Sequence, residues 1–256
     1  IYNGAILIKT KFQADVVYIT PAEQTAKEYE KAIRHLIEKE QANLIIAPSF
    51  LYRRAIDNIA HQYPDTQFVV LDVLSKNMEN TNVTSVIFAQ HEGSFVVGAL
   101  AAKMTLTKNI GFIGGADVDV IKAFLEGFRE GIEYVNPNVN LHVEYVSFKP
   151  DYSGFASPEK GLKIANSLYQ KGIDIIYSVA GGTGNGIIQS AKENKKFVIG
   201  VDSNQDHMAP GYVLTSMMKR WDRSIAFIYQ KYMSNQLTGT RVFELDYKTG
   251  GVGLTD

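Results

Sequence analysis

The stretch "DIIYSVAGGTGNGIIQSAKENKKFVIGVD" (residues 174–202) contains a complete strand, loop, helix and strand. An apolar run at 174–180 is followed by four glycines within six positions, a helical stretch, and a second apolar run at 196–202. Both runs are short, rich in branched residues and almost continuously apolar, as is typical of parallel strands covered on both faces. Because two parallel strands need a crossover of this kind, we expect an open α/β sheet.

The same alternation of apolar runs and amphipathic helical stretches covers nearly the whole chain. Strands are expected at 14–19, 43–47, 67–72, 82–88, 109–115, 141–148, 174–180, 196–202, 211–221 and 240–247. One helix has a clear expected start, with Ser157 as its N-cap and Pro158 in its first turn. Helical spacing is also present at the beginning of the chain, at Ile1, Ala5, Ile8 and Phe12. We therefore expect an N-terminally incomplete chain that starts inside a helix, its export signal removed beforehand.

Two successive series of strands and helices predict two sheets, with a boundary near residues 104–109. We expect an N-terminal lobe formed by residues 1–107 and about 221–239. The C-terminal lobe is expected to comprise residues 108–220 and about 240–256. The last part of the chain should therefore cross between the lobes more than once.

The composition excludes several classes of protein. Of the 256 residues, 45% are hydrophobic and 21% are charged, which is ordinary for a globular protein. The net charge of -1 and the lack of any basic run argue against a nucleic-acid partner. The chain contains no cysteine, and its five histidines lie on separate expected elements with no i, i+4 pair. We therefore expect no metal site and no cofactor.

The glycine-rich loop does not match either common phosphate-binding motif. Gly186 is followed by isoleucine where a P-loop requires lysine. Ile187 occupies the position of the third glycine of the dinucleotide fingerprint. Asp202 does lie at about the sequence separation expected of the ribose-binding acid in that motif. Two interpretations remain: a tight turn that needs positive φ, or a loop whose backbone N–H groups approach a ligand closely. The number of glycines favours the second interpretation.

Ligands of open α/β sheets bind where the carboxyl ends of the strands meet helix N-termini. The candidate ligand-binding residues at or near these positions are Ser49, Phe50, Asp117, Phe155, Gly181, Gly182, Asp202 and Lys219. This set is polar and aromatic, with few cations and no histidine, and it suits a neutral, hydroxyl-bearing small molecule with a flat ring. Structural alternatives stay open: the two aspartates are also suited to capping helices, Phe155 to covering a lobe, and Lys219 to a solvated position.

Signals for catalysis are weak. "IAPSF" (46–50) is not a nucleophile elbow, and no serine hydrolase is supported. Asp117 and Asp202 are candidates for a carboxylate pair across a cleft, but two strand-end acids equally describe a polyol-binding site. We therefore expect a binding protein without catalytic residues.

Several long motifs resemble one family. They are "FAQHEGSFVVGALAA" (88–102), "NIGFIGGADVDVIKAFLEGFREG" (109–131), "SVAGGTGNGIIQSAKE" (178–193), "IGVDSNQ" (199–205), "VLTSMMKR" (213–220) and "GGVGLTD" (250–256). The chain is similar over essentially its whole length to the basic membrane protein family, substrate-binding lipoproteins of ABC transporters that include purine nucleoside receptor A-like proteins. The resemblance implies a type I periplasmic-binding-protein fold. This has two doubly wound parallel-sheet lobes, joined by a hinge that the chain crosses three times, and closes on its ligand.

The resemblance also implies roles for individual residues. Phe155, in "FASPEKG", matches the aromatic residue that stacks on the base, and Asp202 matches the acid that holds ribose hydroxyls. Lys219 would contact the ligand near the hinge, while Gly181 and Gly182 would frame the base edge through their backbone. Asp117 would add a polar contact. The strand and Asp-rich loop with which family members begin, and which carry further base contacts, are absent from this chain.

The function implied is that of a solute receptor that binds a nucleoside, with a purine favoured, in the cleft between the lobes and docks on an ABC permease. The resemblance implies an extracytoplasmic location and a lipid anchor through a cysteine absent from this chain. Two alternatives stay open. One is a ligand-sensing domain for another small molecule, such as riboflavin or a sugar, and the other is a nucleoside-processing enzyme.

Overall fold

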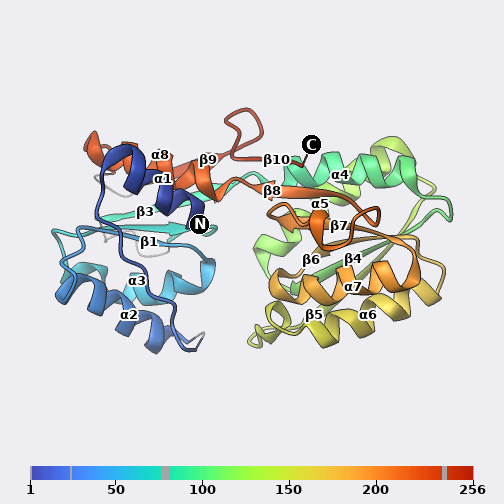
Figure 1. The fold of residues 1–256 in the computed structure, drawn as a ribbon, viewed down its shortest axis with the longest axis horizontal. Helices are drawn as coiled ribbons and strands as arrows, with labels where there is room; N and C mark the ends of the chain where they lie inside the picture. Colours follow the sequence, from blue (N-terminus) through green and yellow to red (C-terminus); the bar gives the residue numbers. More distant parts are fainter. Residues whose placement is uncertain (1, 24, 76–80, 238–240, 256) are drawn as a thin grey trace. The chain divides into compact units, whose positions relative to one another are not determined.

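The structure is a computed structural model that describes residues 2–23, 25–75, 81–237 and 241–255. The chain divides into two compact units (Figure 1). Unit 1 comprises Ile1–Phe88 and Trp221–Leu245, and unit 2 comprises Ala89–Arg220 and Asp246–Asp256. The chain therefore passes from one unit to the other three times.

The boundaries of the units differ from those expected from the sequence. Helix α4 (Gln90–Met104), expected in the first lobe, packs along α5 (Asp119–Val135) in unit 2. Strand β9 (Arg241–Leu245), expected in the second lobe, pairs with β3 (Val83–Phe88) in unit 1. In both cases a long-range packing partner decides the assignment, and sequence alone does not identify that partner. The expected change of lobe at 239–240 falls outside the described residues.

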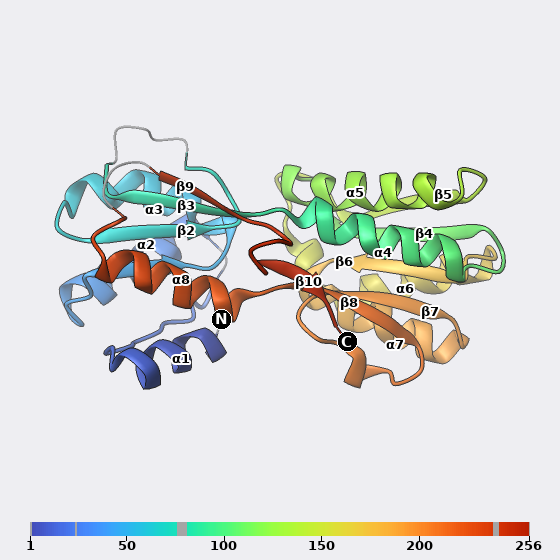
Figure 2. The same cartoon turned by 90° about the horizontal axis from the view of Figure 1, so that it is seen from above.

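Unit 1 is built on a four-stranded parallel sheet in the order β1-β2-β3-β9. Its other elements are β1 (Leu44–Ala47), β2 (Gln67–Leu71), α1 (Tyr2–Phe12), α2 (Ala26–Glu38), α3 (Arg53–Ile59), α8 (Trp221–Met233) and the short helices η1 (Phe50–Tyr52) and η2 (Ala60–Gln62). Helices α1 and α8 lie side by side on one face of the sheet, and α2 and α3 cover the other (Figures 1 and 2). Gly4 permits the first of these pairings, because a Cβ there would lie 2.9 Å from the Cβ of Ile225. Ile1, the first member of the expected helical stripe, lies outside the described residues.

The strand expected at 14–19 is wrong, because this segment has no regular secondary structure. Val17 is 49% exposed and Tyr18 is 71% exposed, so the apolar run does not enter the core. A strand needs a neighbour to satisfy its backbone N–H and C=O groups. Within the described part of unit 1, no strand pairs with these residues.

Unit 2 contains a six-stranded sheet in the order β10-β8-β7-β6-β4-β5, in which only β10 is antiparallel among the described strands. Its strands are β4 (Asn109–Ala116), β5 (Asn140–Ser147), β6 (Ile175–Val179), β7 (Phe197–Asp202), β8 (Val213–Lys219) and β10 (Val252–Leu254). Its other helices are α6 (Pro158–Gln170), α7 (Gly184–Asn194), η3 (Ser153–Phe155), η4 (Gly181–Thr183) and η5 (Asp206–Met208).

Side-chain alternation along the strands of unit 2 builds a core on each face of the sheet. Phe112 and Tyr177 point toward Phe128 of α5, with ring centroids 6.3 and 4.8 Å from the Phe128 ring. Ile113 and Ile176, one position along each strand, belong to the opposite core with residues of α6 and α7. Helices α4 and α5 thus cover one face and α6 and α7 the other (Figure 1). This is the doubly wound arrangement expected from the sequence.

The start of α6 agrees with the sequence in position but not in mechanism. The helix begins at Pro158, directly after Ser157. The Ser157 hydroxyl makes no capping hydrogen bond and instead donates to the Ser153 carbonyl oxygen at 2.7 Å. The expected N-cap interaction of Ser157 is therefore wrong, because its side chain stabilises the preceding turn.

Glycines bring the backbones of α4 and α5 into direct contact. A Cβ on Gly98 would overlap the Phe128 carbonyl oxygen, and one on Gly127 would overlap the His91 carbonyl oxygen. Gly131 has the same relation to Phe95. Because all three obstacles are backbone atoms, side-chain rotation cannot relieve them. The close pairing of α4 with α5 therefore depends on these three residues.

We predict that Gly98→Ala lowers the free energy of unfolding by about 1–3 kcal/mol, because the added methyl forces the two helices apart. Urea unfolding monitored by circular dichroism measures this loss. Gly253→Ala is the control, since no heavy atom lies within 4 Å of a Cβ built there, and it should change stability by less than about 0.5 kcal/mol. Equal stability of the two variants would contradict the proposed packing.

Candidate ligand-binding site

Parallel pairing in unit 2 brings six of the eight candidate residues to one edge of the sheet. Strands β4, β5, β6, β7 and β8 all run in the same direction, so their carboxyl ends and the loops that follow lie together. The candidates on this strand-end edge are Asp117 after β4, Phe155 after β5, Gly181 and Gly182 after β6, Asp202 at the end of β7, and Lys219 at the end of β8.

The other two candidates, Ser49 and Phe50, belong to unit 1 and follow β1. The Ser49 hydroxyl accepts a hydrogen bond from the Leu51 N–H at 3.3 Å and caps η1. Phe50 is the first residue of that turn and is half-buried. Ser49 thus has a structural role in addition to the ligand contact expected from the sequence.

The glycine-rich loop presents bare backbone at the strand-end edge. Gly181 has φ +55, a conformation that glycine adopts without the steric cost of a side chain. Gly181 and Gly182 are exposed, whereas Thr183 and Gly184 directly after them are buried. The loop therefore anchors itself through its second half and leaves the peptide groups of its first half accessible.

Phe155 is half-buried, and its ring lies over the end of β4. A Cβ on Gly115 would overlap the Phe155 ring, with the Cε1 atom only 2.5 Å away. A Cβ on Gly181 would lie 3.7 Å from the Cδ1 atom of the same ring. The ring therefore packs between a glycine of β4 and a glycine of the exposed loop, which gives it a defined position at the strand-end edge.

Asp202 ends β7 in a left-handed backbone conformation, with φ 66. It is half-buried and pairs with Met218 of β8, so Lys219 is the next residue on the neighbouring strand. A residue with a side chain pays a steric cost in this conformation, although aspartate tolerates it better than most. This conformation at the end of a strand makes the Asp202 carboxylate a candidate for ligand binding.

A buried aromatic group lies beneath Asp202 and Lys219. Lys219 is 3% exposed, and its Nζ lies 4.7 Å from the centre of the Phe124 ring. The Phe124 ring in turn lies 6.4 Å from that of Tyr177, whose hydroxyl is 3.2 Å from the Ser94 hydroxyl. Burial raises the pKa of the Tyr177 hydroxyl far above its ordinary value, and the negative charge of Asp202 raises it further. Tyr177 therefore stays neutral and uncharged beneath the acid.

Asp117 forms an ion pair with Lys122 of α5, with 3.0 Å between Oδ1 and Nζ. The hydrogen bond and charge of Asp117 raise the pKa of the Lys122 ammonium group. Asp117 is 37% exposed, so this ion pair contributes little to stability.

Tyr177 lies in the strand expected at 174–180, whereas the sequence pattern does not identify Phe124 or Ser94 as neighbours of the site. A buried tyrosine hydroxyl needs a polar partner, and this requirement is the signal that connects Tyr177 to a serine elsewhere in the chain. The identity of that serine depends on how α4 packs against the sheet, which the sequence pattern does not specify.

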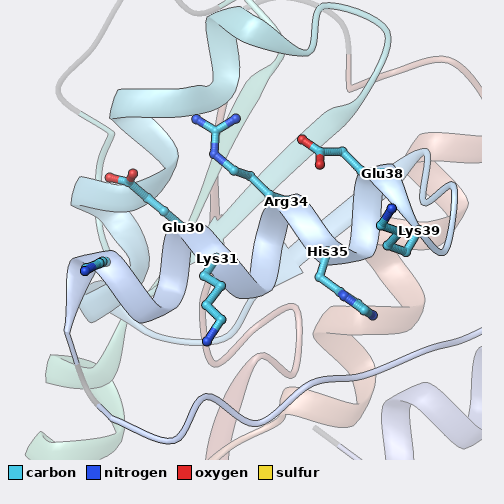
Figure 3. Close-up of a pocket in the computed structure, with 7 residues that line it drawn as sticks. Glu30, Lys31, Arg34, His35, Glu38 and Lys39 are labelled. Atoms are coloured by element: carbon cyan, nitrogen blue, oxygen red, sulfur yellow. The ribbon is translucent and has the colours of Figure 1, made fainter.

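A separate depression of about 430 Å³ lies over the solvent face of α2 (Figure 3). Its charged side chains are largely engaged with neighbouring elements: Arg34 donates to the Tyr63 hydroxyl and to Gln62 Oε1, both at 2.7 Å. Glu30 accepts from Asn58 at 3.0 Å. Because these contacts fix α2 on the following elements, we interpret this surface as structural.

Within residues 2–23, 25–75, 81–237 and 241–255, no group of three or more metal-ligating side chains is close enough to hold an ion. In the same described part of the chain, no helix has the length and apolar character needed to cross a bilayer.

The fold defines the class of protein. A solved structure of an ABC transporter solute-binding protein from Aeropyrum pernix K1 matches with a TM-score of 0.86 and 25% identity, over 100% of this chain and 71% of that one. The chain therefore has the type I periplasmic-binding-protein fold of solute-binding proteins.

The Bmp family profile, described as "ABC transporter substrate-binding protein PnrA-like", matches residues 1–256. The chain belongs to this family. The family expected from the sequence motifs is thus confirmed, as is the fold class, and the family consists of substrate-binding proteins rather than enzymes.

Two relatives illustrate the similarity. The CD4+ T-cell-stimulating antigen of Listeria monocytogenes is 33% identical over 230 residues, covering 84% of this chain and 62% of the relative. Basic membrane protein A1 of Borrelia garinii subsp. bavariensis is 30% identical over 256 residues, covering 98% of this chain and 73% of the relative. The chain therefore spans less than two thirds of the Listeria protein.

The backbone conformation of Asp202 generates a prediction. Asp202→Gly and Asp202→Ala both remove the carboxylate, but only alanine retains the steric cost of positive φ. We expect the glycine variant to be more stable than the alanine variant by about 1 kcal/mol in urea unfolding.

The same pair of substitutions at Glu126, an exposed position inside α5, serves as the control. There alanine should be the more stable variant, by about 1 kcal/mol, because glycine is a poor helix former. An alanine variant at position 202 as stable as the glycine variant would contradict the assigned conformation.

Proposed function

We propose that this chain is the ligand-binding part of an ABC transporter receptor and that it binds a nucleoside at the strand-end edge of unit 2. The observation that carries the proposal is the combination of a positioned aromatic ring, an accessible glycine backbone and a strand-end carboxylate on one edge. Phe155, Gly181 and Gly182, and Asp202 supply these three features.

Each feature has a counterpart in a nucleoside. The Phe155 ring offers a flat surface for stacking with the base, worth about 0.5–1.5 kcal/mol beyond the area buried. The Asp202 carboxylate accepts hydrogen bonds from two adjacent ribose hydroxyls, each worth about 1.5–3 kcal/mol because the acceptor is charged. The Gly181 and Gly182 peptides approach the edge of the base without side chains in the way. Lys219 and Asp117 lie at the margins of this surface and complete its polar contacts.

A purine fits this proposal better than a pyrimidine, because its two rings give a larger surface for stacking on Phe155. Ser49 and Phe50 of unit 1 remain proposed ligand-binding residues of that unit. The proposed site on unit 2 depends neither on the purine preference nor on Ser49 and Phe50.

Membership of an ABC substrate-binding family supports the rest of the proposal. The receptor would work outside the cytoplasm, deliver its ligand to a membrane permease, and be held at the membrane by a lipid attached outside these 256 residues. Binding without chemistry agrees with the family, whose members are substrate-binding proteins.

The proposed ligand is tested by thermal unfolding of the protein with a panel of nucleosides, free bases, riboflavin and simple sugars. A ligand present at about 100 times its Kd adds about 2.7 kcal/mol of stability, and raises Tm by several degrees. We expect a shift with nucleosides. Asp202→Ala removes both charged hydrogen bonds and should weaken binding by about 150-fold or more, and Phe155→Ala should weaken it by about 2- to 12-fold, in proportion to the interactions removed.

Asp202→Asn is the matched control, because it keeps the shape and the backbone preference of aspartate while removing the charge, and it should fall between wild type and Asp202→Ala. A shift produced only by riboflavin or a sugar would keep the fold and overturn the nucleoside. The absence of a Tm shift with every compound of the panel would contradict the proposed ligand class and favour a sensor of a different molecule.

A further inference from the structure

The loop that carries Phe155 is tied down by a buried threonine. Thr183 is fully buried at the end of η4, and its Oγ1 donates to the Gly154 carbonyl oxygen at 2.7 Å. Thr183 Oγ1 also accepts a hydrogen bond from the Ser157 N–H at 2.7 Å. Residues 154 and 157 lie on either side of Phe155 in the sequence, so one hydroxyl holds both flanks of the segment that presents the ring.

A second buried hydroxyl ties the same segment to strand β5. Ser147 is 5% exposed, and its Oγ accepts from the Gly154 N–H at 3.2 Å. It lies 2.8 Å from the Asp151 carbonyl oxygen and 3.1 Å from that of Gly115, and its single hydrogen bonds to one of them at a time. Both the N–H and the C=O of Gly154 are therefore bonded to side chains from other elements.

Close contacts with backbone atoms surround the loop and the Phe155 ring. A Cβ on Gly154 would overlap the Gly115 carbonyl oxygen and would lie 2.5 Å from Ser147 Oγ. The loop thus lies directly on the end of β4, and the Phe155 ring fills the place where a side chain of Gly115 would be. The hydroxyls of Thr183 and Ser147 and the close packing at Gly115 and Gly154 thus hold the half-buried Phe155 ring in place.

We propose that Thr183 and Ser147 are positioning residues that hold the Phe155 ring as a pre-formed platform for the flat ring of a ligand. This inference rests on the proposed function, in which that flat ring is the base of a nucleoside. A ring fixed before binding loses little conformational freedom when the base stacks on it, and so more of the contact energy appears as affinity. The effect of both hydroxyls on affinity passes through Phe155.

A double-mutant cycle tests the route of this effect. Thr183→Val removes the hydroxyl and keeps the shape, whereas Thr183→Ser keeps the hydroxyl and is the matched control. Affinity is measured by calorimetry with whichever of adenosine, guanosine, cytidine or uridine binds most tightly. We expect Thr183→Val to weaken binding by about 2- to 12-fold, the range that loss of stacking gives, and Thr183→Ser by less than about twofold.

In a Phe155→Ala background, Thr183→Val should weaken binding no further, because the ring through which it acts is gone. An equal loss in both backgrounds would show general damage to the site and overturn the inference. Should Thr183→Val fail to fold, Ser147→Ala in the same two backgrounds gives the same comparison, with the same outcomes.

A second measurement needs no ligand. 4-Fluorophenylalanine placed at position 155 reports the freedom of the ring by fluorine NMR. The inference predicts that Thr183→Val moves its resonance toward that of a solvent-exposed, freely rotating ring, while Thr183→Ser leaves it in place. A resonance unchanged by Thr183→Val overturns the inference. If the wild-type protein binds no nucleoside, the proposed function fails, and this measurement still decides whether Thr183 positions the ring.

Discussion

Parallel pairing of five strands in unit 2 is the constraint on which the rest of the account depends. A parallel strand sends its chain back through a helix, so every carboxyl end, and every loop that follows, lies on the same edge of the sheet. Residues that are up to 102 positions apart, Asp117 and Lys219, reach one edge for this reason alone. The ligand chemistry is then decided by the few side chains that the loops leave accessible.

Helix packing on the two faces of this sheet supports the edge in different ways. On the α4 and α5 face, direct backbone contact at Gly98, Gly127 and Gly131 draws the helices together above the aromatic core. The Phe124 ring of that core lies against both Tyr177 and Lys219, so packing there sets the surroundings of the strand ends. On the other face, η4 provides the exposed Gly181 and Gly182 and the buried hydroxyl of Thr183. A small-molecule site needs both a rigid support, here the packed helices, and accessible binding groups, here the exposed glycine peptides.

Sequence patterns were sufficient where the deciding interaction was local. The runs at 67–72 and 174–180 form strands because nearly continuous apolar character matches burial on both faces. The run at 14–19 has the same character and forms no strand, because a strand also needs a partner, and pairing is not a local property. The candidate residues were found by their place after a strand, but Phe124, and the roles of Ser147 and Thr183 as supports of Phe155, depend on contacts between distant segments. Similarly, Ser157 precedes its helix as expected, while its hydroxyl serves the turn before it.

The central claim is that the strand-end residues of unit 2 form one ligand surface. Its most direct test is a titration of isotope-labelled protein with a nucleoside, followed by amide chemical shifts. The account predicts that the largest changes fall together on the amides of Asp117, Phe155, Gly181, Gly182, Asp202 and Lys219. Changes centred elsewhere, for example on the charged depression over α2, with the strand-end amides unmoved, would contradict it.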